Sequence, residues 1–208
     1  MPRSIFAVRI DVTAARRSEV KALSRVLGRA FFDDPVMQWM VPDDARRASA
    51  LPRIFAAMTR HHFLAGEAVE LASRGADVGA AALWDPPGRW KTTPREDLAM
   101  MPTFLLAMRG QSKRGMEVSE LMKRHHPEEP HWYLAVIGSD PDVRGTGFGQ
   151  ALMASRLDRC DAEGAPAYLE STKESNVPYY LRFGFEVTGE LVVPGGGPTM
   201  WQMWRAPR

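Results

Sequence analysis

The chain has 208 residues, of which 45% are hydrophobic and 25% charged, and its formal net charge is +2. This length suits the core of one globular domain, and we expect a single domain over residues 1–208. The charge is too balanced, and Lys and Arg too scattered, to indicate a nucleic-acid partner.

Cysteine usage and hydropathy bear on the compartment. Cys160 is the only cysteine, so an internal disulfide is excluded and a reducing compartment is favoured. Arg9 and Asp11 interrupt the apolar run near the N-terminus, and no stretch of the sequence approaches a membrane span. We therefore expect a cytoplasmic protein with no membrane partner.

The first half of the sequence predicts a strand followed by helices. Residues 5–12 alternate apolar and polar side chains, as a half-buried strand does. Thr13 is suited to cap a helix over 14–31. Residues 36–41 form a short apolar segment, and residues 45–64 repeat apolar side chains at helical spacing.

The remaining elements predict a mixed sheet. Residues 68–73 and 78–84 flank a short turn and predict an antiparallel hairpin. Two helices follow over 94–108 and 113–125. The chain then predicts a strand, a helix, a strand, a brief helix and a closing hairpin, over 132–138, 148–163, 167–170, 177–183, and 185–193 with 200–205. This order predicts an α/β (α+β) fold.

One stretch, residues 131–149 (HWYLAVIGSDPDVRGTGFG), joins an apolar strand to a helix through a glycine-rich turn. Arg144 is followed by Gly145, Gly147 and Gly149. Because glycine has no Cβ, its backbone N–H can approach phosphate oxygens, and a helix start adds partial positive charge. The stretch therefore predicts a ligand that carries phosphate.

Two known phosphate-binding designs fit this stretch poorly. A Walker loop requires Gly-Lys-Ser/Thr, whereas Gly147 is followed by Phe148 and Gly149. A dinucleotide site has its glycines spaced G-x-G-x-x-G directly after the strand, with an acid about 20 residues later. Glu170 lies near that distance, but the spacing here is G-x-G-x-G and residues 139–143 separate the strand from the loop.

The loop Arg144–Gly149 resembles the acetyl-CoA pyrophosphate loop of the GNAT superfamily of N-acetyltransferases. A second block, residues 176–185 (NVPYYLRFGF), resembles the later superfamily block in which an Asn is followed by Tyr-x-x-x-Gly-Phe. Segments 126–135, 168–171 and 197–201 narrow the likeness to puromycin N-acetyltransferase-like proteins. Ser139 departs from the pattern, because the family usually has a β-branched apolar residue there.

The resemblance implies a mixed, mostly antiparallel central sheet flanked by helices, with a CoA-binding core over about 131–190. It implies an enzyme that transfers the acetyl group of acetyl-CoA, as cosubstrate and without a metal, to a primary amine by direct attack. The acceptor implied is a small molecule, of antibiotic or aminonucleoside type in the narrower likeness. A peptide or protein N-acetyltransferase and a non-catalytic acyl-CoA-binding sensor remain alternatives, and the oligomeric state is open, a homodimer included.

The resemblance also assigns site residues. Tyr180 holds the position of the acid that protonates the leaving thiolate. Glu170, at the end of a strand beside the cofactor strand, is our candidate for the base that deprotonates the amine, and His131 is a weaker one. The residues expected to contact CoA come from the strand end, the loop and the second block: Val136, Ile137, Gly138, Ser139, Arg144, Gly145, Thr146, Gly147, Phe148, Gly149 and Asn176.

Four residues have a structural interpretation beside the functional one. Asp34 and Trp39 pair a carboxylate with an aromatic ring, which suits a cationic amine substrate, but they equally suit a helix stop and a core aromatic. Asn176 is first of all suited to cap a helix. Cys160 lies on the apolar side of its helix and predicts packing, not a nucleophile.

Overall fold

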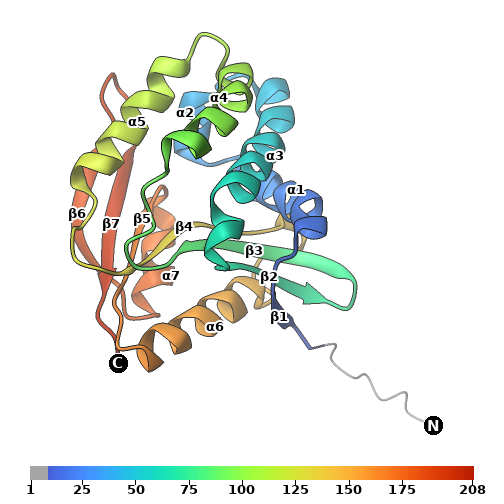
Figure 1. Ribbon diagram of the computed structural model, residues 1–208, viewed down its shortest axis with the longest axis vertical. Coiled ribbons are helices and arrows are strands. Elements are labelled where there is room, and N and C mark those ends of the chain that lie inside the picture. Colours follow the sequence, from blue (N-terminus) through green and yellow to red (C-terminus); the bar gives the residue numbers. More distant parts are fainter. Residues whose placement is uncertain (1–8) are drawn as a thin grey trace.

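The computed structural model describes residues 9–208 and contains one seven-stranded sheet (Figure 1). The strand order is β1-β2-β3-β4-β5-β7-β6. Every neighbouring pair is antiparallel except β4 and β5, which are parallel. The predicted class, a mixed and mostly antiparallel sheet flanked by helices, is confirmed.

The elements follow one another along the chain with short connections. The strands are β1 (Asp11–Ala14), β2 (Val69–Arg74), β3 (Asp77–Asp85), β4 (Trp132–Ser139), β5 (Ala167–Ser171), β6 (Glu186–Val192) and β7 (Thr199–Arg205). The α-helices are α1 (Val20–Ala30), α2 (Pro35–Met40), α3 (Asp44–His61), α4 (Pro94–Met108), α5 (Ser112–His125), α6 (Phe148–Ala162) and α7 (Val177–Leu181). Short 3₁₀ helices are η1 (Arg17–Glu19), η2 (Phe63–Gly66), η3 (Pro141–Val143) and η4 (Glu174–Asn176).

Helices cover both faces of the sheet (Figure 1). On one face, α1 and α3 bury Leu27 and Phe55 against Leu83 of β3. On the opposite face, α6 buries Leu152 against Trp84, and α7 joins the same cluster. Burial of one large apolar side chain contributes about 1.5–3 kcal/mol, so these two layers fix how the strands splay between them.

A third apolar cluster joins α2 and α5 to the β6–β7 hairpin. Met40, Val118, Leu191 and Met200 are buried in it. The α4 helix packs mainly on α3. The cluster thus ties the segment between β3 and β4 to the far edge of the sheet.

The structure corrects the start of the predicted elements. Thr13 does not cap a helix, because it lies in β1 and pairs with Leu71 of β2; α1 begins later, at Val20. Of the strand predicted over 5–12, residues 5–8 lie outside the described part, and β1 begins at Asp11. The apolar segment 36–41 folds as α2, with Asp34 as its N-cap.

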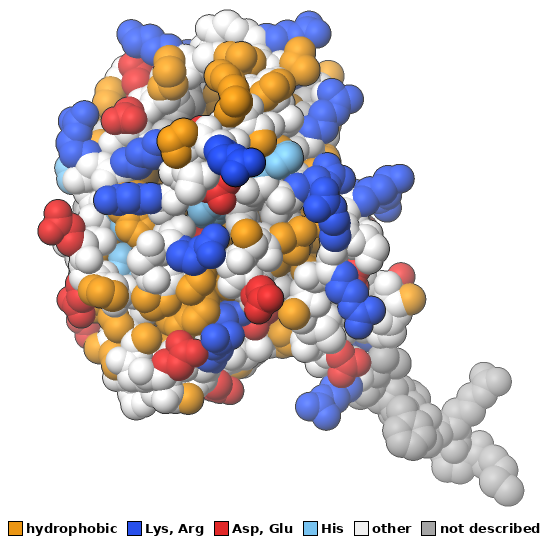
Figure 2. Space-filling view, viewed as in Figure 1, with side chains coloured by type: hydrophobic (Ala, Val, Ile, Leu, Met, Phe, Trp, Pro, Cys, Tyr) orange, Lys and Arg blue, Asp and Glu red, His pale blue; other side chains and the backbone are white. Residues whose placement is uncertain are grey.

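Charged side chains are dispersed over the surface, whereas exposed apolar side chains lie in groups. In Figure 2, Lys and Arg side chains are scattered over the visible face, and apolar ones gather near the top, where α4 and α5 lie, and in a second area at the lower left. The exposed large apolar residues of these helices are Leu98, Met101, Leu105, Leu106 and Met116. Within residues 9–208, none of the helices has the length and hydropathy needed to cross a bilayer.

Candidate active site

A cavity of about 660 Å³ opens where β4 and β5 separate. The two strands pair only from Trp132 to Leu134, opposite Ala167 to Leu169. Beyond that point, residues 136–139 pair with β3 on one side, and the other side of this stretch borders the cavity. Backbone N–H and C=O groups on that side are therefore available to a ligand.

Gly138 brings α1 close to this open strand. A Cβ on Gly138 would lie 2.7 Å from the Cβ of Ala30 and 3.1 Å from Leu27, which is too close for any larger residue. The end of α1 and the turn after it consequently form one wall of the cavity, with Ala30 and Phe31 lining it.

The glycine loop lines the cavity at the start of α6. Gly145 and Gly147 have φ of +78° and +97°, a region that side chains disfavour. The Thr146 N–H donates to the Val143 carbonyl at 3.3 Å. This N–H is therefore already hydrogen-bonded within the turn. The N–H groups in the first turn of α6, which begins at Phe148, have no partner inside the helix, whereas the Ala151 N–H donates to the Gly147 carbonyl.

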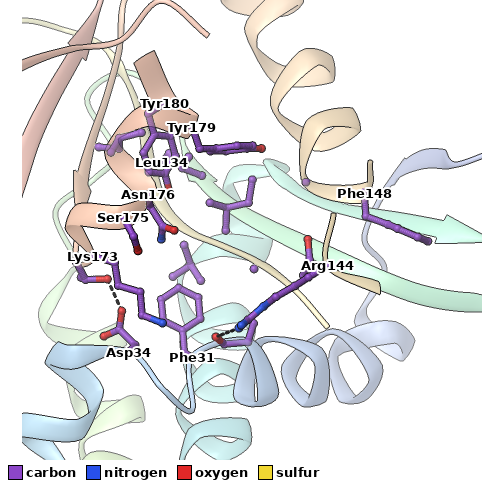
Figure 3. A pocket seen from close by; sticks show the side chains of 18 of the residues that line it. Phe31, Asp34, Leu134, Arg144, Phe148, Lys173, Ser175, Asn176, Tyr179 and Tyr180 are labelled. Carbon is purple, nitrogen blue, oxygen red and sulfur yellow. Dashed lines mark hydrogen bonds between the residues drawn. The ribbon is translucent and has the colours of Figure 1, made fainter. Parts of the chain in front are cut away.

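Arg144 reaches across the cavity toward α1 (Figure 3). Its Nη2 donates to the Ala30 carbonyl at 2.9 Å and lies 3.6 Å from Asp33 Oδ1. Lys173, from the loop after β5, pairs with the same Asp33 at 2.9 Å. Two cations thus meet one exposed carboxylate at the cavity mouth, and the pKa of Asp33 is lowered because they outweigh its partial burial.

Two tyrosines from α7 border the cavity (Figure 3). Tyr180 is 8% exposed, and burial raises the pKa of its hydroxyl above the usual 10.0, with the charge of Asp34 adding to the effect. Tyr179 packs edge-on against it, with ring centroids 5.3 Å apart. The Tyr179 hydroxyl is buried without a hydrogen-bond partner, 3.3 Å from where a Cβ of Gly149 would be.

Glu170 lines the cavity from the end of β5, and its side chain is 1% exposed. Tyr168 Oη donates to Glu170 Oε1 at 3.0 Å. Burial raises the pKa of Glu170 from 4.5 to about 7, against the lowering effect of hydrogen bonds with Tyr133 and Tyr168. A carboxyl group with this pKa can exchange a proton near neutral pH.

Asp34 lines the cavity, but both of its oxygens have partners within the chain. Oδ1 accepts from the backbone N–H of Val36 and of Met37, each at 3.0 Å, and Oδ2 accepts from Thr172 Oγ1. Asp34 therefore caps α2 and ties it to the loop after β5. Burial raises its pKa despite these bonds.

Neither Trp39 nor His131 borders the cavity among the described residues, whereas Asn176 does. Trp39 is not among the described residues that line the cavity; it packs under Arg114, whose guanidinium lies 5.0 Å from its ring. His131 is buried behind Glu170 and also does not border the cavity. Asn176 lines the cavity but makes no capping hydrogen bond, because η4 runs directly into α7.

Several residues of the site were missed from the sequence. Tyr133 and Tyr168 lie behind the cavity on the face of adjacent strands that also carries the predicted Glu170, and the i, i+2 spacing of Tyr168 and Glu170 could have revealed part of this. Thr172, Lys173 and the partners of Arg144 come together only through long-range packing, for which the sequence gives no signal. In residues 9–208, His, Cys, Asp and Glu do not cluster in threes as metal ligands would.

Comparison with known proteins shows which family part of this sequence resembles. Residues 116–185 match the Acetyltransferase (GNAT) family. An uncharacterized N-acetyltransferase of Schizosaccharomyces pombe is 27% identical over 189 residues, covering 83% of this chain and 74% of that protein. These matches support an acetyl-CoA-dependent N-acetyltransferase that resembles the GNAT family over residues 116–185.

Solved structures share the fold of this chain. A crystal structure described as histone acetyltransferase HPA2 and related acetyltransferase, from Corynebacterium glutamicum, has a TM-score of 0.71 and 23% identity, with 96% of this chain and 97% of that chain covered. Arylalkylamine N-acetyltransferase 2 from Aedes aegypti has a TM-score of 0.57 and 13% identity, with 96% and 100% covered.

GNAT acetyltransferases use acetyl-CoA as cosubstrate, and the groups that line the cavity are of the kinds that such a molecule needs. A Cβ on Gly145 would project into open space, so the loop backbone is bare on that side. The loop and the α6 N-terminus offer donors to a pyrophosphate, and the open edge of β4 offers backbone groups to an extended amide-containing arm.

Proposed function

We propose that the chain, as a single domain over residues 1–208, transfers the acetyl group of acetyl-CoA to a primary amine of a small molecule. In the net reaction the amine nitrogen forms the amide bond while the carbon–sulfur bond breaks. The amine loses one proton and the departing thiolate gains one. The observation that carries the proposal is one cavity bordered by the glycine loop, the open strand edge, Glu170 and Tyr180.

The loop and strand residues would hold the cosubstrate. Backbone N–H groups of Gly145, Gly147 and the first turn of α6 would bind the pyrophosphate. Arg144 would add charge while its bond to Ala30 keeps it in place. The strand edge from Val136 to Ser139 would align the arm that carries the thioester, and Asn176 would contact it from the opposite wall.

Glu170 would act as the general base. Its side chain is buried, it borders the cavity, and its pKa of about 7 lets it accept the amine proton at neutral pH. The hydroxyl of Tyr168 orients the carboxylate from behind. General-base catalysis of this kind contributes about 10²–10⁴-fold to the rate.

Tyr180 would donate the proton that the thiolate needs. Burial keeps its hydroxyl protonated, since the pKa is raised. A free thiol has a pKa of about 8.5, so the departing thiolate is weakly basic and gains from a nearby donor. Tyr180 lies on the side of the cavity formed by α7, across from Phe31 (Figure 3).

The borders of the cavity favour a small acceptor over an extended peptide. Helix α2, which follows the cavity-lining residues Asp33 and Asp34, packs with α5 and the β6–β7 hairpin in one apolar cluster, which would limit the space for an extended acceptor on this side. Asp34 would contact the acceptor through its cavity-facing side, and Trp39 would act only by packing beneath this border. Relatives of the fold include enzymes named for arylalkylamines and for histones, so both acceptor classes belong in the test.

The test is release of free thiol from acetyl-CoA in the presence of arylalkylamines, aminoglycosides, aminonucleosides or peptides. The proposal predicts turnover with at least one small amine and none with peptides. Turnover with peptides alone would contradict the small-molecule assignment. Tight acetyl-CoA binding without turnover on any amine would instead identify a sensor.

A further inference from the structure

Glu170 faces the cavity on one side and a buried polar network on the other. Trp132, Leu134 and Leu169 point toward α6, so the alternate residues Tyr168 and Glu170 point to the opposite face. There they meet the connector 126–131 between α5 and β4, together with β7. The cavity-lining role of Glu170 does not account for this network.

The first chain of hydrogen bonds begins at a backbone carbonyl at the C-terminal end of α5. Gln202 Nε2 donates to the His125 carbonyl at 2.9 Å, which fixes the orientation of the Gln202 amide because a carbonyl can only accept. The same Nε2 donates to Tyr168 Oη at 2.9 Å. Tyr168 thus receives one hydrogen bond and turns its own proton toward Glu170 Oε1, 3.0 Å away.

The second chain of hydrogen bonds begins at a backbone carbonyl of the connector 126–131. His131 Nδ1 lies 2.6 Å from the Glu129 carbonyl and must donate to it. His131 Nε2 lies 3.1 Å from His126 Nε2, so one of these two nitrogens carries a proton. Burial lowers the pKa of both rings, that of His126 to about 3, and therefore both are neutral at pH 7.

The proton positions in the histidine pair follow from this. Neutral His131 holds its one proton on Nδ1, so its Nε2 accepts and His126 Nε2 donates. His126 Nδ1 is then left with a lone pair, and it lies 4.0 Å from Glu170 Oε1. Trp90 stacks on the His126 ring at 3.7 Å and holds it in this position.

We propose that Gln202, His131 and His126 are positioning residues for Glu170. They aim the Tyr168 hydroxyl at the Glu170 carboxylate, and they keep His126 from adding a third donor to those of Tyr133 and Tyr168, so that the carboxyl group can both take up and release a proton. The inference rests on the proposed role of Glu170 as base. With Tyr133 and Tyr168 alone the ionised carboxylate is less stabilised than it would be with His126 as a third donor.

The groups around the carboxyl come from five segments of the chain. Tyr133 of β4 and Tyr168 of β5 are hydrogen-bonded to it, and His126 of the connector faces it at 4.0 Å. Asp85, at the end of β3, acts on Tyr133, and Lys91 acts on His126. These surroundings bear on the titration of Glu170 together with the two chains.

The direct test is the tautomer of each ring, read from ¹⁵N chemical shifts of histidines in the full-length protein at pH 7. Single variants of the five histidines assign the signals. The expected result is a proton on Nδ1 of His131 and on Nε2 of His126. A proton on Nδ1 of His126, or a charged ring in either residue, would overturn the proposal.

A second test is His131→Phe, which frees His126 to turn an Nδ1–H toward Glu170. The pH at which Glu170 is half ionised should fall by at least about one unit, a tenfold change in proton concentration. The readout is the carboxyl infrared band that is absent in Glu170→Gln. His125→Asn is the matched control, because that side chain is exposed and bonds the Leu121 carbonyl; it should leave the band unshifted.

The infrared titration needs no substrate, so it tests the positioning role independently of turnover. Full turnover in Glu170→Gln would reject only the role of Glu170 as base. An identical titration in wild type and His131→Phe would contradict the positioning role. Should His131→Phe fail to fold, Gln202→Leu replaces it. Loss of the oriented donor should then raise the half-ionisation pH, and an unchanged value would overturn the inference.

Discussion

Tyr168 and Glu170 are two residues apart on β5, and the Tyr168 hydroxyl donates to Glu170 Oε1 across 3.0 Å. The bond joins a buried network to a carboxyl group that borders the cavity. It defines what Glu170 can do, because a carboxyl with few donors and little solvent ionises only near neutral pH.

Stability should carry the signature of this carboxyl. The folded-state pKa of Glu170 is raised to about 7, so its stabilising contribution is present at low pH and is lost as the pH rises through that value. Between pH 4.5 and 7 the free energy of unfolding should fall by about 1.4 kcal/mol per pH unit from this group, or about 3 kcal/mol in all. Denaturant titrations should show this component in wild type and its loss in Glu170→Gln; equal slopes in both proteins would contradict it.

Tyr180→Phe should reduce kcat about a hundredfold while changing the KM for acetyl-CoA little, because only the donated proton is removed. Tyr179→Phe is the matched control, since its ring lies beside that of Tyr180 on the same helix. It should leave kcat within a few-fold of wild type. A larger loss of kcat in the Tyr179 variant than in the Tyr180 variant would show that Tyr180 is not the acid.

Gly145→Ala should weaken acetyl-CoA binding. Gly145 has φ of +78°, and an alanine there would shift the loop backbone away from the pyrophosphate. Gly75→Ala, in the β2–β3 turn, is matched because it has φ of +65° and equally open surroundings. Both variants should lose about 1–2 kcal/mol of stability, but only Gly145→Ala should raise the KM for acetyl-CoA, by about tenfold; a rise in both would contradict the assignment.

Cys160 should be inert in the folded protein. It lies on α6 and is fully buried in the apolar cluster between that helix and the sheet. Burial raises the pKa of its thiol to about 12. Maleimide labelling at pH 8 should therefore be at least about a thousandfold slower than in the unfolded chain, with no loss of turnover. Rapid labelling with inactivation would show that the thiol reaches the cavity.

The sequence predicted the parts that local patterns determine. The hairpin, α4 to α6, and the loop at Gly145 and Gly147 follow from periodicity and glycine spacing. The start of α1 was predicted too early, because pairing of Thr13 with Leu71 outweighs its capping preference. The network behind Glu170 could not be predicted, since it joins the end of α5 and the connector 126–131 to Gln202 of the last strand through long-range packing.

The central claim is that this cavity deprotonates an amine through Glu170. The most direct measurement is kcat/KM for thiol release from acetyl-CoA against pH, for wild type and Glu170→Gln with the best amine of the panel. The account predicts a wild-type acidic limb with an apparent pKa near 7, and a loss of about 10²–10⁴-fold with disappearance of that limb in the variant. An unchanged rate and an unchanged limb in Glu170→Gln would contradict it.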